Sequence, residues 1–499
     1  MIKTEYVMNG NKSIPQIKIP IKPNELTIEA VEPYLDSVFS QFEKNANEIR
    51  RYYDMYCLNH MIVSKVRAHN DTDINNIVLV PDLKAMVDWK TGYTVGNPIK
   101  YAQNESSNTD DISQINKYRR NVVQRSIDKE VTKWAYATGV GYYFIEPRSD
   151  TFDVLTEAPY EEYQRDSDTC TKVYSAFGGN KPLFDMLYTT YETINKDKLK
   201  ETVRVLDIYL PAVLYTYEKR TGMPRWTLVS AESRGISKPL PLVEKRPNTD
   251  GIGIVAMGET LQYAVDNLLS NGLDNVEDIV NEIFVYKNVN LGNTPEEQAN
   301  NHRKMKRNGA VILNSSSKDL QAGLDTISTK LSLAEVRELF AIIDAKFHSS
   351  IGVPMEMSNT NSGGTTKQGS EVANGYDNAY NRALDDINSF MVADTELLNK
   401  IMWICKNTKG NTINNLSSSE IEIKYSLNLT DNMLTKSQSY GTFIQTMPPS
   451  MALRLTRLSN DAEAEGKLIV ESEIYQAYLA SLHSKSQQNN NSQEGVINS

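Results

Sequence analysis

The chain has 499 residues, enough to bury a large core and to form more than one module. Its formal net charge of -10 and pI of about 5.3 argue against a protein that grips nucleic acid over a broad basic face, but not against one past which nucleic acid slides. No apolar run approaches the ~20 residues that span a bilayer. The N-terminus, Met1 to Glu5, lacks the apolar core of a signal peptide. We therefore expect no membrane association.

The first 56 residues divide into an arm and a helix. Pro15, Pro20 and Pro23 oppose a helix in residues 1–24, which we expect to form an extended N-terminal arm. Residues 25–56 predict a helix, because apolar residues recur at helical spacing. These residues are Leu26, Val31, Leu35, Val38, Phe39 and Phe42.

Two further helices and a strand follow before residue 150. Residues 76–101 predict a helix that ends near Gly92, followed by a short extended piece. Residues 113–138 predict another helix, with Gly139 as its C-cap. Gly141 to Ile145 has the aromatic and β-branched composition of a strand.

Residues 150–250 carry most of the β signal. Alternating stretches rich in Tyr, Val and Thr are typical of half-buried strands. They cover residues 173–177, 186–194, 203–218 and 225–230.

A long helix is predicted from about Glu259 to Ile283, because apolar residues follow one another in steps of three and four. Acidic residues occupy much of the remaining surface, which we therefore expect to be an acidic face. They are Asp266, Asp274, Glu277, Asp278 and Glu282.

A small compact insert occupies residues 284–326. It begins with a strand at 284–289 and continues with a helix whose start is marked by Thr294, Pro295 and Glu297. Gly309 ends this helix, and Ala310 to Leu313 predicts a second strand.

The helix of the insert is almost wholly polar, so it should need a packing partner, such as the same segment of a neighbouring subunit. Its end is basic, with Arg303, Lys304, Lys306 and Arg307. These cations complement the helix dipole, or they form a contact surface for an acidic partner or for passing phosphates; the sequence leaves both open.

Two helices flank a polar loop after the insert. The first starts at the capping-box pair Ser332 and Glu335 and ends at Gly352 and Pro354. The second runs from about Ser370 to Lys406, a length that suits a brace for something larger. The loop between them, residues 355–369, does not fit the phosphate-loop pattern, since Lys367 follows Thr366 and Gln368 is neither Ser nor Thr.

The C-terminal part predicts one strand at 420–429, helices from about 433 to 482, and a disordered tail from Ser484. The three cysteines, Cys57, Cys170 and Cys405, show no metal-ligand spacing and are expected to be buried or partly buried free thiols. The five histidines form no zinc motif. Acidic pairs such as Asp385 and Asp386 fit a solvated helix face, and nothing requires catalysis, a metal or a cofactor.

The order of these elements resembles the portal proteins of tailed bacteriophages, in the branch typical of long non-contractile-tailed phages. No single motif is very specific, and the order carries the resemblance over most of residues 25–482. The loop at 356–369 holds no aromatic residue, where portals of this branch often have one. The similar stretches are Val87 to Ile99, Glu130 to Glu146, Leu240 to Gly253, Leu320 to Ser370, Leu427 to Asp431 and Leu458 to Glu465.

This resemblance implies an α+β fold: a portal-type ring subunit with an α/β wing, a two-helix stem, a small α/β clip, a long bracing helix and a helical crown. The implied segments, in order, are the arm 1–24, wing 25–255, stem helix 256–283, clip 284–326, second stem helix 327–351, tunnel loop 352–369, long wing helix and strand 370–432, crown 433–483 and disordered tail 484–499.

The resemblance also implies a non-enzymatic function. Such subunits form a homo-oligomer, usually a dodecamer, at one capsid vertex of the virion, and double-stranded DNA slides through it during packaging and ejection. The implied protein partners are the terminase large subunit, the head–tail adaptor, and the major capsid and scaffolding proteins. The alternative is a nucleotide-binding enzyme that uses the Gly363 to Lys367 loop.

The resemblance assigns residues to three surfaces. The DNA-facing tunnel loop would present Asn359, Thr360, Asn361, Thr365, Thr366, Lys367 and Gln368. The channel-lining stem would present Asp274, Glu277, Asp278 and Glu282, since an acidic wall would not hold a duplex that carries one charge per ~1.7 Å. The clip would bind its partners through Lys287, Arg303, Lys304, Lys306 and Arg307.

Overall fold

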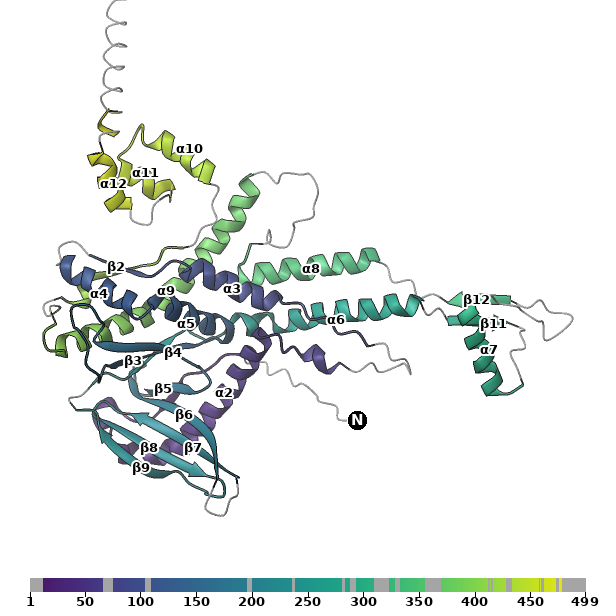
Figure 1. Cartoon of the computed structure of the whole chain (residues 1–499), viewed down its shortest axis with the longest axis horizontal. Helices are drawn as coiled ribbons and strands as arrows, with labels where there is room; N and C mark the ends of the chain where they lie inside the picture. The colour runs from purple at the N-terminus through teal and green to yellow at the C-terminus, as the bar shows by residue number, and fades with distance from the viewer. Residues whose placement is uncertain are drawn as a thin grey trace, which may run out of the picture.

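A computed structural model shows a broad body of sheets and helices that carries a narrow two-helix extension (Figure 1). A small unit of two strands and one helix lies at the far end of this extension. The mixed α+β class predicted from the sequence is confirmed. The structure describes residues 12–65, 75–103, 109–194, 200–235, 238–280, 283–287, 293–308, 323–327, 333–354, 369–411, 413, 416–427, 433–456, 458, 462–472 and 475–477.

The largest sheet has the strand order β1-β5-β6-β7-β8-β9, and neighbours from β5 to β9 are antiparallel. Helix α2, Leu35–Tyr56, lies on it, and its Phe39 and Phe42 pack on Tyr188. The β-rich segments predicted between residues 150 and 250 are confirmed. The strands are β1 Ile17–Ile19, β5 Cys170–Ser175, β6 Pro182–Ile194, β7 Lys200–Tyr209, β8 Val213–Arg220 and β9 Thr227–Ser233.

The described part of the extended arm expected over residues 1–24 is extended, and it packs on the body. Strand β1 pairs in parallel with β5, and Ile14, Ile17, Ile19 and Ile21 are buried. The prolines do oppose a helix, but isoleucine near every second position gives an extended segment one apolar face that the sheet can bury. The predicted 25–56 helix is also divided: α1 covers Ile28–Val31, and a short turn separates it from α2.

A second sheet has the order β10-β3-β4 and packs against helices. Helix α3 passes through Gly92, where we expected its end, and continues to Val95. The single helix predicted at 113–138 is two helices, because Val123 takes a left-handed φ of 56° that no α-helix accommodates. The elements are α3 Asp82–Val95, α4 Thr109–Asn121, α5 Gln124–Thr138, β3 Gly141–Pro147, β4 Tyr160–Arg165 and β10 Leu242–Lys245.

Three glycines allow two distant chain segments to touch. Gly139 caps α5 with a φ of 97°, and its N–H donates to the Ala135 carbonyl over 2.9 Å, so the predicted C-cap is confirmed. A Cβ on Gly139 would lie 2.1 Å from the Gly251 oxygen, and one on Gly253 would lie 2.5 Å from the Ala137 oxygen. The close approach fixes where α6 leaves the body, because α6 begins directly after Gly253.

The extension consists of α6, Ile254–Val280, and α8, Leu333–Ile351, which lie side by side (Figure 1). Gly352, with a φ of 79°, ends α8 as predicted. At the far end, β11 Ile283–Lys287 pairs with β12 Gly323–Ile327, and α7 covers Pro295–Asn308. The Thr294 cap is confirmed, since its Oγ1 accepts from the Glu297 N–H over 3.2 Å. We did not predict β12, and the strand expected at 310–313 lies outside the described residues.

Helix α9, Gly369–Asn407, matches the predicted long helix to within one residue at each end. It spans ~58 Å at ~1.5 Å per residue and runs back through the body, packing on β3 and β10. The remaining elements are β2 Lys100–Gln103, which pairs with β13 Ile421–Lys424, and helices α10 Met433–Phe443, α11 Pro449–Thr456 and α12 Ala462–Glu471. The expected tail lies outside the described residues.

Candidate nucleic-acid channel

A ladder of polar side chains runs along one side of α6. Its members stand four residues apart and accept hydrogen bonds from backbone N–H groups of the extended segment 75–81, which we call the strap, and of Leu83. Four helical residues advance ~6 Å and two extended residues ~6.6 Å, so the two periods nearly match. The bonds are Asn76 to Asp274 at 2.7 Å, Val78 to Ser270 at 3.0 Å, Val80 to Asp266 at 3.1 Å and Leu83 to Gln262 at 3.2 Å.

A buried ion pair and a buried histidine–carboxylate contact reinforce this ladder. His60 Nδ1 lies 2.7 Å from an Asp266 carboxylate oxygen, and Lys65 Nζ lies 2.8 Å from Asp274. Burial would raise the pKa of Asp274, but the Lys65 ammonium and the Asn76 N–H lower it below its usual value. Both carboxylates are at most 2% exposed.

The acidic face predicted for α6 is therefore partly wrong. Asp274 was expected to line a channel, and Asp266 to face solvent, but both are buried against residues 60–80 of their own chain. The sequence did contain a sign of this arrangement. Four polar residues follow one another every four positions, as expected for a helix face that hydrogen-bonds to backbone; they are Gln262, Asp266, Ser270 and Asp274. The side chains of Glu277 and Asp278, and all of Glu282, lie outside the described residues.

We expect Asp274→Ala to lower the free energy of unfolding by about 2 kcal/mol, because it leaves the Lys65 ammonium and the Asn76 N–H without their acceptor. The amide of Asn76 should also exchange hydrogen faster. Asn267→Ala on the exposed side of the same helix is the matched control and should change stability by less than about 0.5 kcal/mol. Unchanged exchange at Asn76 would contradict the ladder.

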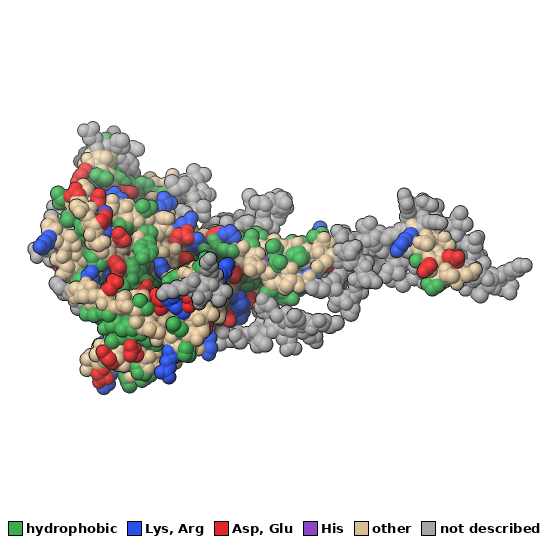
Figure 2. All heavy atoms as spheres, turned by 60° about the horizontal axis from the view of Figure 1, so that its bottom comes forward, with side chains coloured by type: hydrophobic (Ala, Val, Ile, Leu, Met, Phe, Trp, Pro, Cys, Tyr) green, Lys and Arg blue, Asp and Glu red, His purple; other side chains and the backbone are tan. Residues whose placement is uncertain are grey.

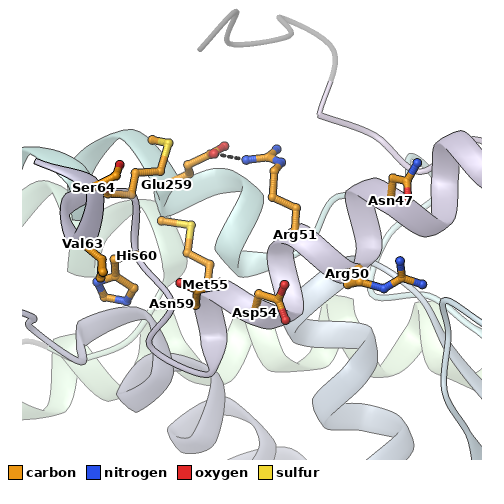
Figure 3. Close-up of a pocket in the computed structure, with 11 residues that line it drawn as sticks. Asn47, Arg50, Arg51, Asp54, Met55, Asn59, His60, Val63, Ser64 and Glu259 are labelled. Atoms are coloured by element: carbon orange, nitrogen blue, oxygen red, sulfur yellow. Dashed lines mark hydrogen bonds and ion pairs between the residues drawn. The ribbon is translucent and has the colours of Figure 1, made fainter. Parts of the chain in front are cut away.

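A cleft of about 430 Å³ lies where α2 meets the start of α6 (Figure 3). Figure 3 shows Arg51 of α2 reaching toward Glu259 of α6, with which it forms an ion pair. Arg51 also pairs with Glu48 over 2.8 Å, and Arg50 pairs with Asp168 over 3.0 Å. Since the arginines that line this cleft already have carboxylate partners, it is a joint between two helices rather than an anion site.

Helix α8 offers a more exposed surface than α6. Leu339 and Ile342 are 47% and 53% exposed, and Glu338 and Lys346 of the same helix are also exposed. In Figure 1, α8 and the N-terminal end of α9 lie on the same side of the body as α10 to α12, whereas the six-stranded sheet lies on the opposite side.

The structure tests few of the predicted site residues directly. The tunnel-loop residues Asn359, Thr360, Asn361, Thr365, Thr366, Lys367 and Gln368 lie outside the described residues. Lys287 lies in β11, and Lys304, Lys306 and Arg307 lie in α7, but their side chains are not among those described. Arg303 is exposed on α7.

Sequence reasoning missed a buried charge cluster that ties α9 to the sheets. Glu396 of α9 forms ion pairs with Lys172 of β5 and with Lys400 one turn further along α9. Lys400 also donates to the Leu242 carbonyl over 2.6 Å. Burial and the Lys172 ammonium lower the pKa of Lys400 to about 8. Asp185 of β6 faces the same two lysines, and burial raises its pKa to about 6.

A second buried charge cluster lies between α9, the second sheet and the segment that contains Tyr425. Lys245 is fully buried, pairs with Asp394 over 3.2 Å and donates to Tyr425 Oη over 3.1 Å. The carboxylate of Asp386 pairs with Lys90 over 2.7 Å. The expectation that Asp386 belongs to a solvated face is therefore wrong, because its carboxylate faces Lys90 of α3 and accepts from Tyr136 Oη of α5 over 3.1 Å; Asp385 is exposed as expected.

The described residues offer little reactive chemistry. Within them, no group of three His, Cys, Asp or Glu side chains is arranged to hold a metal, and none of the helices has the length and hydropathy to cross a bilayer. His348 is packed, with Nδ1 3.1 Å from the Val353 carbonyl. Cys170 and Cys405 are buried as expected, whereas Cys57 is exposed at the end of α2.

The described residues form a long helix pair with a small terminal unit, on a body braced by α9. Residues 35–476 match the profile of the family described as "Phage portal protein, SPP1 Gp6-like". The chain therefore belongs to this family of phage portal proteins. A comparison with curated proteins finds no significant match.

Family membership confirms several predictions made from the sequence. The chain is a non-enzymatic structural protein that acts in DNA packaging at the phage capsid vertex, and as a portal protein it forms an oligomeric ring through which DNA passes. The alternative of a nucleotide-binding enzyme is set aside, because portal proteins are not enzymes.

Proposed function

We propose that α6 and α8 form the stem of a portal ring, most simply a dodecamer, that encloses the channel for packaging and ejection of double-stranded DNA. The observation that supports this most is the two-helix extension, which leaves the body between Gly253 and Gly352 and carries its own small domain. One chain alone leaves Leu339 and Ile342 of this extension exposed, whereas neighbouring stems in a ring would cover apolar surface.

The other segments follow from this assignment. We propose that 25–255 with β1 is the wing, 284–326 the clip, 352–369 the tunnel loop, and 433–483 the crown. The six-stranded sheet and α2 then form the wing's outer part. The stem comprises 256–283 and 327–351, and 370–432 supplies the long helix and strand that brace the wing.

The proposed channel side is the side on which α8, the start of α9 and α10 to α12 lie (Figure 1). This favours α8 over the ladder face of α6 for the lumen of the stem and removes Asp274 from the proposed lining. Glu277, Asp278 and Glu282 remain proposed lining residues near the clip. The tunnel loop would bring Asn359, Thr360, Asn361, Thr365, Thr366, Lys367 and Gln368 to the duplex.

We expect Lys367→Glu to impair DNA packaging without preventing ring assembly, because a carboxylate would repel the phosphates that a lysine contacts transiently. The measurement is the amount of nuclease-protected DNA per particle, with ring formation followed by size-exclusion and mass measurement. Lys409→Glu, an exposed lysine after α9, is the matched control. Normal filling by Lys367→Glu would count against a lumen role for this loop.

The clip is proposed to bind the terminase large subunit during packaging and the head–tail adaptor afterwards. Exposed Arg303 on α7, with Lys287, Lys304, Lys306 and Arg307 nearby in the sequence, supplies the cations for acidic partner surfaces. The major capsid and scaffolding proteins are the proposed partners of the wing.

One image tests the proposal as a whole. Electron microscopy of the purified full-length chain, viewed down the particle axis, should show a ring with a central hole wide enough for a duplex. A stable monomer at micromolar concentration, or a closed particle without a hole, would overturn the assignment of α6 and α8 as a stem.

A further inference from the structure

We propose that the tip of the six-stranded sheet, formed by the ends of β7, β8 and β9, docks an acidic, extended segment of a protein of the capsid shell. We call this surface the wing tip; it comprises Thr202, Arg204 and Lys219 to Met223 with the flanking strand β9. The inference rests on the proposed ring, because only the ring turns this surface toward the shell.

Two cations at the wing tip stand directly opposite each other. Arg204 of β7 and Lys219 of β8 are register partners in the antiparallel pair. Like charges in this relation destabilise a sheet, and neither side chain forms an ion pair with a carboxylate among the described residues. Lys219 lies 5.8 Å from the Trp226 ring centroid, which stabilises only that one ammonium.

The neighbouring charges are already balanced, so they do not neutralise this pair. Arg220 pairs with Glu218 over 3.2 Å and with Glu201 over 3.7 Å. Lys200 pairs with Glu192 over 3.5 Å. Arg204 and Lys219 therefore keep an unbalanced positive charge, to which the exposed Arg225 of the β8–β9 turn adds, and a carboxylate supplied from outside would remove their repulsion.

The surface around the two cations is shaped to hold a chain segment. A hollow of about 330 Å³ lies between Thr202, Arg204 and the β8–β9 turn. Met223, which lines the hollow, is 47% exposed, and the neighbouring strands β6 and β9 carry the exposed apolar side chains Ile194 at 70%, Val229 at 56% and Leu228 at 44%. Such a combination of apolar contacts and an uncompensated charge pair is typical of a docking surface rather than of a solvated sheet end.

Strand β9 adds a reason to expect an extended partner. It is the last strand in the sheet order, and no described strand pairs with its outer edge. It carries neither proline nor lysine, the residues that commonly protect an edge. A partner segment in extended conformation can add to this edge, and its continuation past the β8–β9 turn can place acidic side chains in the hollow at Arg204 and Lys219.

The position of the wing tip selects the shell as the source of this segment. In Figure 1 the tip lies on the side of the body opposite to α8, α10 and α11, which face the proposed channel. In a ring it is therefore peripheral, out of reach of the DNA. Figure 2 shows Lys and Arg side chains interspersed with acidic and hydrophobic ones over the visible face of the body, without the broad basic stripe that would bind a phosphate backbone.

The experiment is the double charge reversal Arg204→Glu with Lys219→Glu, made in the full-length chain and expressed with the phage's own capsid and scaffolding proteins. Rings should form normally, and the number of capsids that contain a portal should fall about tenfold or more, because like charges would now face the acidic partner. Arg125→Glu with Lys129→Glu, two exposed cations on α5, gives the same change of net charge and should incorporate normally.

Second-site suppressors identify the partner. Selection for restored incorporation should yield Asp or Glu changes to Lys or Arg in a protein of the capsid shell, and suppressors in the scaffolding protein would count against the proposal. The proposal is overturned if the double variant incorporates normally, if the α5 control loses incorporation equally, or if the double variant fails to form rings, which would assign the surface to a neighbouring subunit. Suppressors in the terminase would also overturn it. Electron micrographs of the purified wild-type chain test the proposed ring independently. A failure of the proposed function can therefore be told apart from a failure of this inference.

Discussion

Replacing Arg119 by leucine is expected to lower the free energy of unfolding by about 3–5 kcal/mol, the largest effect of any change considered for this chain. The guanidinium is 1% exposed and pairs with both carboxylate oxygens of Glu162 and, over 3.0 Å, with Asp128. Neither carboxylate is more than 2% exposed. Leucine would leave both acids without a cation in a site that water does not reach.

Thermal unfolding of the soluble fraction measures this loss, and much of the variant should be found in the insoluble fraction. Burial already raises the pKa of Glu162, and Arg119 opposes that rise. Without Arg119 the folded-state pKa rises further, so the carboxyl group favours folding below that pKa and this contribution is lost as pH increases. The deficit of the variant should therefore shrink toward acidic pH.

Arg125→Leu, at an exposed arginine six residues further along the chain in α5, is the matched control and should change stability by less than about 0.5 kcal/mol. Combining Arg119→Leu with Glu162→Leu and Asp128→Leu should recover part of the loss, because neither carboxylate then remains buried without its cation. A triple variant less stable than Arg119→Leu alone would show that packing, rather than charge, limits this site.

The second large effect is expected for Glu396→Gln, which should lower stability by about 2–3 kcal/mol; the value is smaller than for Arg119 because the Glu396 side chain is 34% exposed. The change leaves the ammonium groups of Lys172 and Lys400 without the carboxylate that lies between them. Denaturant unfolding of wild type and variant at neutral pH measures the difference. Lys172→Met in the Glu396→Gln background should restore part of it.

The pH dependence of wild type gives an independent check on Glu396. Burial would raise its pKa, but Lys172 and Lys400 lower it from 4.5 to about 2. A lowered folded-state pKa stabilises the protein above pH 4.5 and loses this contribution as pH falls toward 2. Wild type should therefore lose more stability than Glu396→Gln over this range, and parallel curves would contradict the ion-pair geometry.

Elements with long, regular patterns could be predicted from the sequence, and short or charge-dependent features could not. The long helix predicted at 370–406 matches α9 to within one residue at each end, and Gly139 and Gly352 marked real helix ends. Strand β1 was missed because three residues between prolines carry too short a pattern. The division of α4 from α5 was missed because β-branched Val123 gives no sign of a left-handed backbone.

The candidate site was predictable in its order of segments but not in its surfaces. An acidic residue on a predicted helix is normally assigned to solvent, yet Asp266 and Asp274 face a strap that lies almost two hundred residues earlier in the chain. The same reasoning placed Asp386 in solvent, although Lys90 lies 2.7 Å from it. Sequence spacing shows which side chains share a face, but only the fold shows what that face meets.

The strap along α6 has a mechanical consequence. The hydrogen bonds from Asn76 to Leu83 follow one another along the helix. A force along the extension therefore loads all of them in shear at once instead of breaking them one after another. If the strap slid along α6 by a single residue, the outward-facing Ile77 and Leu79 would lie against carboxylates, so no intermediate register is stable. The part of α6 between Gln262 and Asp274 should therefore resist sliding and bending when a force acts along the extension.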